Sequence, residues 1–519
     1  MATQLDGVDP TAARKLLFSI AGLPGGPDRG AVERILHLLD EGPVGAVIDG
    51  EVVSASATFD LLDPSTGALL GSVSDCDAAV VDQAVDAAAQ AFATYKRQSG
   101  ASRGAVLRQM ADVIEQNQEL LAVAEALDTG RPLWEIRAAD LPLVIAHFHY
   151  FAGWAGKEEG TTTGLSDPAI FHYSRREPLG VVGGIIPWNF PLVFAAYRIA
   201  APLAFGNTVV LKPAEQASLS TLLLARLFAD AGVPAGLLNV VPGQGATGAA
   251  LVAHPGVEKI AFTGSVDTGR LVGREAANAI KQVSLELGGK SANIIFDDAP
   301  VDAAVAGALG GIFFAQGQVC TAGSRLFLHR EIRDTVIDRL GQGMAGFVIG
   351  HALDPKTTVG PLVDANQQSR VQQYIDQARE AGLPVLHERK LDLDADLRGG
   401  FFVTPIIFGV DDPGVALWRE EIFGPVLAVA DFDDEHDVVT RANDTTFGLA
   451  NGIWTNNLSR AHRVAAELES GTVWVNTYNM FDPAAPIGGF KSSGIGRELG
   501  SASVQLFTRG KSVWINTAV

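Results

Sequence analysis

The sequence predicts an α/β protein with a doubly wound, mainly parallel sheet and a second α/β domain. Two patterns and the length favour this fold. Short apolar runs recur between Gly180 and Phe296 with helical patterns between several of them, and a similar alternation resumes after Val301. Such alternation is typical of parallel strands buried on both faces. A chain of 519 residues is also too long for one core and should form two or three domains.

The part of the chain before Gly180 is predicted to combine helices with extended segments. Residues 1–44 carry two short helical patterns separated by a turn rich in glycine and proline, and they look appended. Extended pieces begin at Ala46, and two long amphipathic helices follow them. The helices expected here are Ala12–Ile20, Val32–Leu39, Ala78–Tyr95 and Arg103–Glu125.

The buried strands are predicted after Gly180. The strands expected there are Val181–Ile186, Thr208–Leu211, Leu238–Val241, Ile260–Phe262 and Ala292–Phe296, with helices at Ser218–Ala231 and Thr268–Ala279. The second alternation comprises a helix at Asp302–Gln316, a strand at Ser324–Leu328 and a helix at Arg330–Met344. Cys320 lies inside this second unit.

Composition and charge exclude several classes of protein. Lys and Arg number 39 against 59 Asp and Glu, which gives a formal net charge of −20. The field of such a molecule repels polyanions, so neither nucleic acid nor an anionic membrane is an expected partner. Two cysteines cannot form a disulfide framework and fit a reducing cytosol. Met1–Asp6 lacks the features of a signal peptide and Ala303–Ala315 is too short to span a bilayer, so we expect a cytoplasmic protein.

Cys320 and Glu286 are the strongest candidates for catalytic residues. Cys320 lies among small and polar residues in the segment 317–323, and Glu286 stands between an apolar strand and a pair of glycines. A thiolate attacks carbonyl carbons, and a carboxylate can activate the water that hydrolyses a thioester. Taken alone, Cys320 also fits a buried structural cysteine and Glu286 a solvated strand end, but their conjunction favours acyl chemistry. Cys76 stands between two aspartates, which oppose thiolate formation, so we expect it to be inert.

Asn189 is a candidate donor for an oxyanion hole. It lies between Pro187 and Pro191 at the end of a predicted strand. Because proline restricts the backbone on both sides, the amide should point in one direction. A fixed amide N–H beside a nucleophile contributes about 3–4 kcal/mol in other enzymes. An ordinary Asx turn is the alternative interpretation.

A dinucleotide site is predicted at the carboxyl ends of the first strands, where ligands bind in open α/β sheets. Lys212 and Glu215 follow a strand directly, and both could bind ribose hydroxyls. The Glu215 carboxylate would repel a 2′-phosphate, which favours NAD over NADP. The segment 243–248 matches G-x-G-x-x-G only weakly, because Pro242 separates it from its strand. The segment 262–269 turns from a strand directly into a helix whose amides could bind a pyrophosphate. The alternative for Lys212 and Glu215 is a pair of solvated loop charges, and the alternative for 262–269 is an ordinary turn between a strand and a helix.

Together these motifs resemble the NAD(P)-dependent aldehyde dehydrogenase superfamily, from about Ala46 to Trp514. The motifs occur in the family's order and are Pro187-Trp188-Asn189, Phe262-Thr263-Gly264-Ser265, Leu285-Glu286-Leu287-Gly288-Gly289-Lys290, Gly317-Gln318-Val319-Cys320, Glu421-Ile422-Phe423-Gly424-Pro425 and Gly488-Gly489-Phe490-Lys491-Ser492-Ser493-Gly494. The resemblance implies an aldehyde dehydrogenase-like fold whose Rossmann-type NAD-binding domain comprises residues 45–156 and 179–288. A catalytic domain of residues 289–506 and a β oligomerisation arm of residues 157–178 and 507–519 complete the implied organisation.

The resemblance also implies the chemistry. Cys320 would be the nucleophile and Glu286 the general base, and Asn189 with the Cys320 backbone N–H would form the oxyanion hole. A thiohemiacetal on Cys320 would lose hydride to NAD⁺, and water activated by Glu286 would hydrolyse the resulting thioester. The presence of Glu286 argues against relatives that transfer the acyl group to another acceptor. No metal is implied, and the partners expected are a small-molecule aldehyde and further subunits of a homodimer or homotetramer.

The implied cofactor contacts cover both halves of NAD. Lys212 and Glu215 would bind the adenosine ribose. Ser265 would contact the pyrophosphate, and Glu421 with Phe423 would orient the nicotinamide riboside. The other implied cofactor positions are Ile185, Ile186, Pro187, Trp188, Gly245, Gly248, Phe262, Gly264, Leu287, Gly288 and Gln367.

One position departs from the family pattern. Arg198 stands where many members carry a lysine proposed for proton relay, and Glu498 is its expected partner. A guanidinium keeps the charge but does not titrate, so a relay role for Arg198 is in doubt. A non-catalytic structural or nucleotide-sensing relative is the alternative function, and such a protein would tend to lose Cys320 or Glu286.

The expected substrate is a hydrophobic aldehyde. The positions that line the family's aldehyde tunnel are Phe190, Val193, Phe194, Tyr197, Val319, Thr321, Phe481 and Ile487 in this sequence. They carry no charge, which disfavours betaine aldehyde and semialdehydes. The segment 474–483 loosely resembles that of phenylacetaldehyde dehydrogenases, so we expect an aryl or long-chain aldehyde; a small polar aldehyde or a semialdehyde is the alternative. Some of the aromatic residues also fit an ordinary core.

Overall fold

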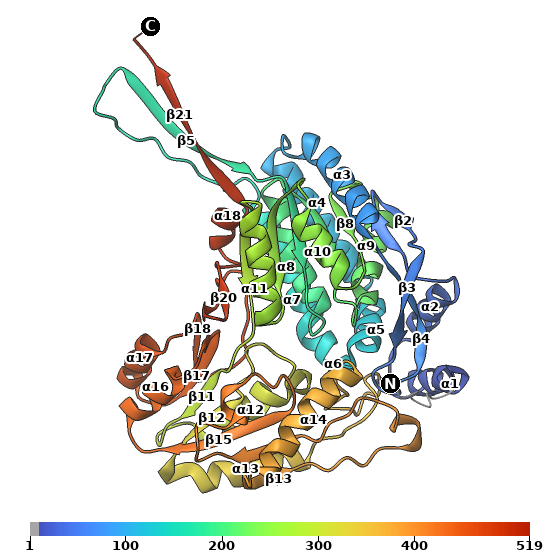
Figure 1. Cartoon of the computed structure of the whole chain (residues 1–519), viewed down its shortest axis with the longest axis vertical. Helices are drawn as coiled ribbons and strands as arrows, with labels where there is room; N and C mark the ends of the chain where they lie inside the picture. The colour runs from blue at the N-terminus through green and yellow to red at the C-terminus, as the bar shows by residue number, and fades with distance from the viewer. Residues whose placement is uncertain (1–9, 519) are drawn as a thin grey trace.

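The computed structural model describes residues 10–518, which form two α/β lobes and a projecting two-stranded arm (Figure 1). The first lobe is built on an eight-stranded sheet and the second on a seven-stranded sheet. The prediction about a signal peptide at Met1–Asp6 concerns residues outside this range. The predicted α/β fold class is confirmed.

The sheet of the first lobe has the strand order β2-β1-β8-β7-β6-β9-β10-β20. The five strands β8, β7, β6, β9 and β10 are parallel, and the strands at both edges are antiparallel. The strands are β1 (Ala46–Ile48), β2 (Glu51–Val53), β6 (Val181–Ile185), β7 (Thr208–Lys212), β8 (Leu238–Val240), β9 (Val257–Thr263), β10 (Gln282–Glu286) and β20 (Gly494–Ile495). Four of the predicted strands therefore form the centre of this sheet.

Helices cover both faces of the first sheet, and a small two-stranded sheet lies beside it. These helices are α1 (Pro10–Ala21), α2 (Arg29–Asp40), α3 (Ala78–Tyr95), α4 (Gly100–Gln116), α5 (Gln118–Thr129), α6 (Leu133–Glu135), the π-helical turn η1 (Ile136–Asp140), α7 (Leu141–Trp154), α8 (Pro191–Ala204), α9 (Leu219–Asp230), α10 (Gly245–Ala253) and α11 (Val266–Asn278). The small sheet pairs β3 (Ala57–Leu62) with β4 (Leu69–Asp75).

Two features of these helices differ from the prediction. The helix predicted at Arg103–Glu125 is two helices, α4 and α5, because the chain leaves helical geometry at Asn117, where φ is −119° and ψ is 20°. The amide of Asn117 donates to the Val113 carbonyl and closes the end of α4. The N-terminal helix α2 buries Val32 and Ile35 in the same core as α5, so this segment packs on the first lobe.

The second lobe contains a seven-stranded sheet in the order β13-β14-β15-β12-β11-β17-β18. Its strands are β11 (Ala292–Ile295), β12 (Arg325–His329), β13 (Val385–Glu388), β14 (Ile406–Gly409), β15 (Val426–Phe432), β17 (Ala450–Trp454) and β18 (Thr472–Val475), and a separate pair is β16 (Phe447–Gly448) with β19 (Phe490–Lys491). The strand predicted at Ala292–Phe296 lies here, between β12 and β17, and not with the four strands that precede it in sequence.

The helices of the second lobe follow the predicted alternation with shifted ends. They are α12 (Val301–Phe313), η2 (Phe314–Gly317), η3 (Arg330–Ile332), α13 (Arg333–Ala345), α14 (Ala365–Glu380), η4 (Ala395–Leu397), α15 (Ala416–Arg419), α16 (Glu435–Asn443) and α17 (Leu458–Glu467). The helix α18 (Ala502–Leu506) lies beside the first lobe, where Val504 and Leu506 pack against its core (Figure 1). The helix predicted at Asp302–Gln316 ends as an α-helix at Phe313, because Ala315 and Gln316 have left-handed backbone angles.

The arm pairs β5 (Ile170–Pro178) with β21 (Thr508–Asn516) in antiparallel register over nine residues. It projects from the body beyond the helices of the first lobe (Figure 1). The side chains of Phe171, Trp514 and Ile515 are exposed on it. Because the partner strand comes from the carboxyl-terminal part of the chain, the arm is not a simple surface hairpin.

In the stretch 10–518, no helix has both the length and the apolar character needed to cross a membrane.

Candidate active site

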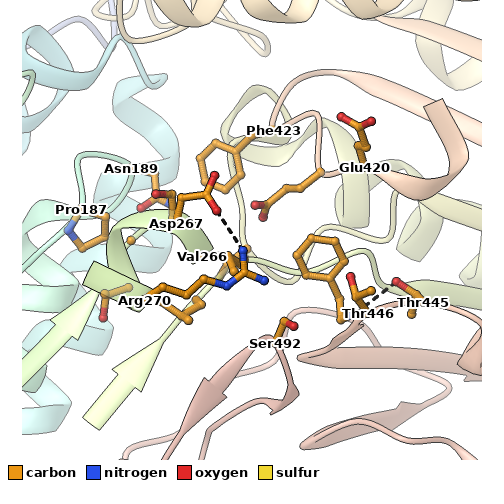
Figure 2. Close-up of a pocket in the computed structure, with 18 of the residues that line it drawn as sticks. Pro187, Asn189, Val266, Asp267, Arg270, Glu420, Phe423, Thr445, Thr446 and Ser492 are labelled. Atoms are coloured by element: carbon orange, nitrogen blue, oxygen red, sulfur yellow. Dashed lines mark hydrogen bonds and ion pairs between the residues drawn. The ribbon is translucent and has the colours of Figure 1, made fainter. Parts of the chain in front are cut away.

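A cleft of about 930 Å³ lies between the two lobes, at the carboxyl ends of the parallel strands of the first sheet. In Figure 2, Pro187, Asn189 and Arg270 from the first lobe face Phe423 and Thr446 from the second. The predicted site residues that line this cleft are Pro187, Trp188, Asn189, Phe194, Gly264, Ser265, Leu287, Gly288, Cys320, Gln367, Glu421 and Phe423. Residues far apart in the sequence therefore meet in one place.

Cys320 follows the turn η2 and lines the cleft with a partly exposed side chain. Burial raises the pKa of the Cys320 thiol to about 12, and the nearby carboxyl groups of Glu421 and Glu286 add to the rise. The raised pKa favours the thiol over the thiolate. This agrees with a nucleophile that must lose its proton during the reaction.

Glu286 is the last residue of β10, and this strand lies between β9 and the short edge strand β20. Its side chain is buried, and Oε1 has no hydrogen-bond partner in the described structure. Burial raises the pKa of Glu286 well above its ordinary value, Glu498 adds to the rise, and Arg198 opposes it. A carboxyl group with a raised pKa suits general acid–base chemistry near neutral pH.

Asn189 precedes α8, and its amide reaches the segment that carries the cysteine. Nδ2 donates to the carbonyl oxygen of Gln318 at 2.8 Å, two residues before Cys320. Oδ1 of Asn189 is buried without a partner. Since an amide nitrogen carries two hydrogens, one remains available in the cleft that Asn189 and Cys320 both line.

Two glycines after Glu286 let this segment pack tightly against the second lobe. A Cβ built at Gly288 would lie 2.1 Å from Oε2 of Glu421, and one at Gly289 would lie 2.4 Å from the carbonyl oxygen of Cys320. The Gly289 N–H donates to Oε1 of Glu421 at 3.0 Å. Burial raises the pKa of Glu421 to about 7, and this hydrogen bond opposes the rise. The two glycines thus allow Glu286, Cys320 and Glu421 to lie close together.

Phe423 has a left-handed backbone, with φ of 63°. Its carbonyl oxygen accepts a hydrogen bond from Nε2 of Gln367 at 2.8 Å, and its ring meets the ring of Trp188 edge to face at 5.2 Å. The Arg370 guanidinium donates to the Glu421 carbonyl at 2.9 Å. These contacts fix the loop that forms the second-lobe wall of the cleft.

Lys212 and Glu215 lie beyond the cleft lining, at the carboxyl end of β7. Their side chains are 3.1 Å apart, and burial lowers the pKa of Lys212 while Glu215 opposes that change. A Cβ built at Gly245 meets no atom within 4 Å, and one at Gly248 meets only Ile185 at 3.9 Å. The amino end of α10 therefore faces open space.

The other predicted site residues are not part of the cleft lining. Ile185, Ile186 and Phe262 are buried at the ends of β6 and β9. In the predicted tunnel, Val193, Tyr197, Val319 and Thr321 are buried, and Phe190, Phe481 and Ile487 are partly buried. Tyr197 packs against the ring of His147, with the ring centres 4.5 Å apart. Sequence reasoning missed this buried histidine because no motif marks it on α7.

Arg198 is fully buried and pairs with Glu498, as the sequence suggested for these two residues. It also donates to the Thr263 hydroxyl, and the Ser284 hydroxyl donates to Glu498 at 3.2 Å. Lys259 lies on the same strand as Thr263, and burial lowers its pKa to about 7 with Arg198 adding to the fall. Sequence reasoning missed Lys259, because no motif marks a lysine in the middle of a strand.

The aldehyde dehydrogenase family model matches residues 52–513. The chain belongs to this family.

Individual aldehyde dehydrogenases match the chain closely. The protein DhaS of Bacillus subtilis (strain 168) is 44% identical over 490 residues, which cover 93% of this chain and 98% of DhaS. The betaine aldehyde dehydrogenase of Mesorhizobium japonicum is 42% identical over 91% of this chain and 96% of its own length. A solved NAD⁺ complex of an aldehyde dehydrogenase from Bacillus cereus is 42% identical, has a TM-score of 0.91, and covers 95% of this chain and 100% of that chain.

These matches confirm the predicted superfamily and enzyme class: the chain is an oxidoreductase of the aldehyde dehydrogenase family and acts on aldehydes. The family match spans both lobes and most of the arm.

Proposed function

We propose that this aldehyde dehydrogenase oxidises a hydrophobic aldehyde to the carboxylic acid with NAD⁺, through a covalent intermediate on Cys320. The observation that carries the proposal is that Cys320 and Asn189 line one cleft, while Glu286 lies buried directly before the lining residues Leu287 and Gly288 and acts electrostatically on Cys320. Nucleophile, oxyanion donor and base are the three groups that thioester chemistry requires.

In the first half of the reaction the Cys320 thiol releases its proton to solvent, and the sulfur forms a bond with the aldehyde carbon. As the carbonyl oxygen becomes negative, the free N–H of Asn189 and the backbone N–H of Cys320 donate to it and give a thiohemiacetal. Loss of a hydride from the former carbonyl carbon then leaves a thioester on the sulfur. NAD⁺, when bound, accepts that hydride.

Glu286 acts in the second half. Its carboxylate takes a proton from a water molecule as the water oxygen attacks the thioester carbon. The carbon–sulfur bond breaks and the carboxylic acid leaves. The sulfur takes the proton held by Glu286, which restores the thiol and the carboxylate. The unpartnered Oε1 of Glu286 supports this role, because it has an unused acceptor position at the end of β10.

The residues of the first lobe fit NAD⁺ by their chemistry. The open amino end of α10 leaves room for the adenosine half, and Lys212 with Glu215 can bind its ribose hydroxyls. Ser265 caps α11, whose amino-terminal amides favour a pyrophosphate. Glu421 and Phe423 would hold the nicotinamide riboside. The Glu215 carboxylate disfavours the extra phosphate of NADP⁺.

The tunnel residues support a hydrophobic, aryl-type aldehyde. Phe190, Phe194, Tyr197 and Phe481 supply aromatic surface, and none of the eight positions is charged. One relative is named for betaine aldehyde, so the substrate class needs its own test. The kcat/KM values for phenylacetaldehyde, hexanal, glyceraldehyde, betaine aldehyde and succinate semialdehyde, each with NAD⁺ and with NADP⁺, provide it. Preference for a charged or small polar aldehyde would contradict the proposal.

We further propose that the arm pairs subunits into a dimer or tetramer and that the enzyme is cytoplasmic. The exposed apolar side chains Phe171, Trp514 and Ile515 support the first part. The scarcity of cysteine supports the second.

A further inference from the structure

The backbone just before Cys320 is strained. Ala315 and Gln316 have φ of 50° and 55°, a left-handed region that residues other than glycine rarely adopt. Such a conformation is unfavourable for a residue with a Cβ and persists only where neighbouring contacts enforce it. Gly317 follows with φ of 73°, and a side chain there would collide with the Gly424 carbonyl. Some group must therefore hold this turn in place.

Glu135 holds it from the first lobe. Both of its carboxylate oxygens lie 3.2 Å from the backbone nitrogen of Ala315, which donates to them. Glu135 is buried on α6, and its Oε2 also accepts a hydrogen bond from Arg131 at 3.3 Å. The strained turn is thus tied to a charged network that contacts no solvent.

Arg131 connects this network to the opposite side of the site. Its side chain is 0% exposed, it is held by Asp140 through both terminal nitrogens, and it donates to the carbonyl oxygen of Asn189 at 3.4 Å. The guanidinium also lies 4.0 Å from the ring centre of Phe190 and 5.4 Å from that of Phe314. One side chain therefore contacts both the segment of the oxyanion amide and the segment of the nucleophile.

We propose that Arg131 and Glu135 are positioning residues that set the separation between Asn189 and Cys320. The two segments are also joined directly by the hydrogen bond from Asn189 to the Gln318 carbonyl, so the links form a closed path of contacts between Asn189 and the backbone before Cys320. This inference rests on the roles proposed above for Asn189 and Cys320.

Stability alone does not account for the network. Buried ion pairs are often no more stable than well-packed apolar residues of similar volume, since desolvation offsets their attraction. The fold could bury this region with apolar side chains, but those could not hold the Ala315 amide and the Asn189 carbonyl by hydrogen bonds. Positioning is the role that needs these particular groups.

The test compares Glu135→Gln, Glu135→Met and Arg131→Lys in the full-length enzyme. Glutamine keeps an acceptor for the Ala315 N–H, whereas methionine removes it at similar size. We expect Glu135→Met to lower kcat by about 10²-fold, the usual effect of a displacement near 1 Å, with the KM for NAD⁺ within about twofold. Glu135→Gln should recover most of the rate. Arg131→Lys should also lower kcat, because one ammonium group cannot reach Asn189 and both carboxylates together.

A second measurement needs neither aldehyde nor cofactor. The rate of Cys320 alkylation by iodoacetamide, followed by peptide mass spectrometry, should change at least about tenfold in Glu135→Met and little in Glu135→Gln. It remains informative if wild-type protein forms no NADH, a result that would overturn the proposed function and not this inference. If Glu135→Met does not fold, Arg131→Lys and Glu135→Gln decide the outcome.

Arg103→Met is the matched control. Arg103 is a buried arginine that donates to the Ala204 carbonyl and pairs with Glu158, and it contacts no proposed site residue. Its loss should lower Tm and leave kcat and the alkylation rate unchanged. If Glu135→Met and Arg131→Lys lower Tm in the same way with both rates within about twofold of wild type, the network is structural only and the proposal is wrong.

Discussion

Burial and an unpartnered oxygen make Glu286 the residue whose ionisation should control turnover. Its pKa is raised, so the carboxyl group is largely protonated at low pH and becomes a base only as pH rises through that value. We expect kcat to increase with pH up to a plateau in the wild type. A kcat profile that is flat from pH 6 to pH 9 would contradict this role.

The Glu286→Gln variant separates the two halves of the reaction. Glutamine cannot accept the water proton, so hydrolysis should slow by about 10²–10⁴-fold while acylation of Cys320 continues. Stopped-flow absorbance should show a burst of NADH equal to about one per site, followed by a slow steady rate. A normal steady rate would disprove the assignment of Glu286 as base.

The two cysteines should behave oppositely. Cys320→Ala removes the nucleophile and should lower kcat by about 10⁴-fold or more. Cys76 is 2% exposed, and burial between Asp75 and Asp77 raises the pKa of its thiol to about 12, so Cys76→Ala should keep the wild-type rate. NADH formation by both variants checks this, and intact-mass measurement should find the acyl adduct only when Cys320 is present.

Selection between cofactors should depend on Glu215. Replacing it with glutamine removes a negative charge beside Lys212 and keeps a hydrogen-bonding group. We expect the ratio of kcat/KM for NADP⁺ to that for NAD⁺ to rise about tenfold, which corresponds to about 1.4 kcal/mol of lost repulsion. An unchanged ratio would place the discrimination elsewhere.

At the scale of elements, the close approach of β10 to the nucleophile segment depends on Gly289. A methyl group there would lie 2.4 Å from the Cys320 carbonyl oxygen, so Gly289→Ala must move one segment. We expect kcat to fall by about 10²-fold. Gly310→Ala is the control: it lies in α12 with no atom within 4 Å of the added carbon, and it should stabilise the fold by about 0.5–1 kcal/mol. Equal activities would contradict the packing argument.

The sequence predicts the elements whose apolar pattern is local. The strands of the first sheet are examples, because each is a short run buried on both faces. Sheet membership is harder to predict: Ala292–Ile295 follows these runs in sequence but pairs with β12 and β17, which come later in the chain. The break at Asn117 is equally hidden, since the apolar spacing continues across it.

The site divides in the same way. Cys320 and Glu286 are recognisable because their motifs place glycines and reactive groups within a few positions. No motif marks Arg131 and Glu135, since an arginine followed four residues later by a glutamate is equally typical of a solvent-exposed helix. Their burial becomes visible only in the structure, where α6 and the link between α5 and α6 pack against the loops at Asn189 and Ala315.

At the scale of the whole molecule, subunit pairing should depend on the arm. Trp514 is 63% and Ile515 43% exposed, which is unfavourable for a lone chain. Light scattering should give the mass of a dimer or tetramer for the wild type and a smaller mass for a variant with both residues changed to lysine. Leu458→Lys on α17, distant from the arm in Figure 1, is the control and should leave the mass unchanged. A monomeric wild type would contradict the proposal.

The positions of the two chain ends have a practical consequence. Figure 1 places the carboxyl end at the tip of the arm and the start of the described chain on the far side of the body. If the arm pairs subunits as proposed, a purification tag or surface attachment placed after β21 would interfere with assembly. Immobilisation through the other end leaves that tip free, so it is the better design for a sensor or a reactor.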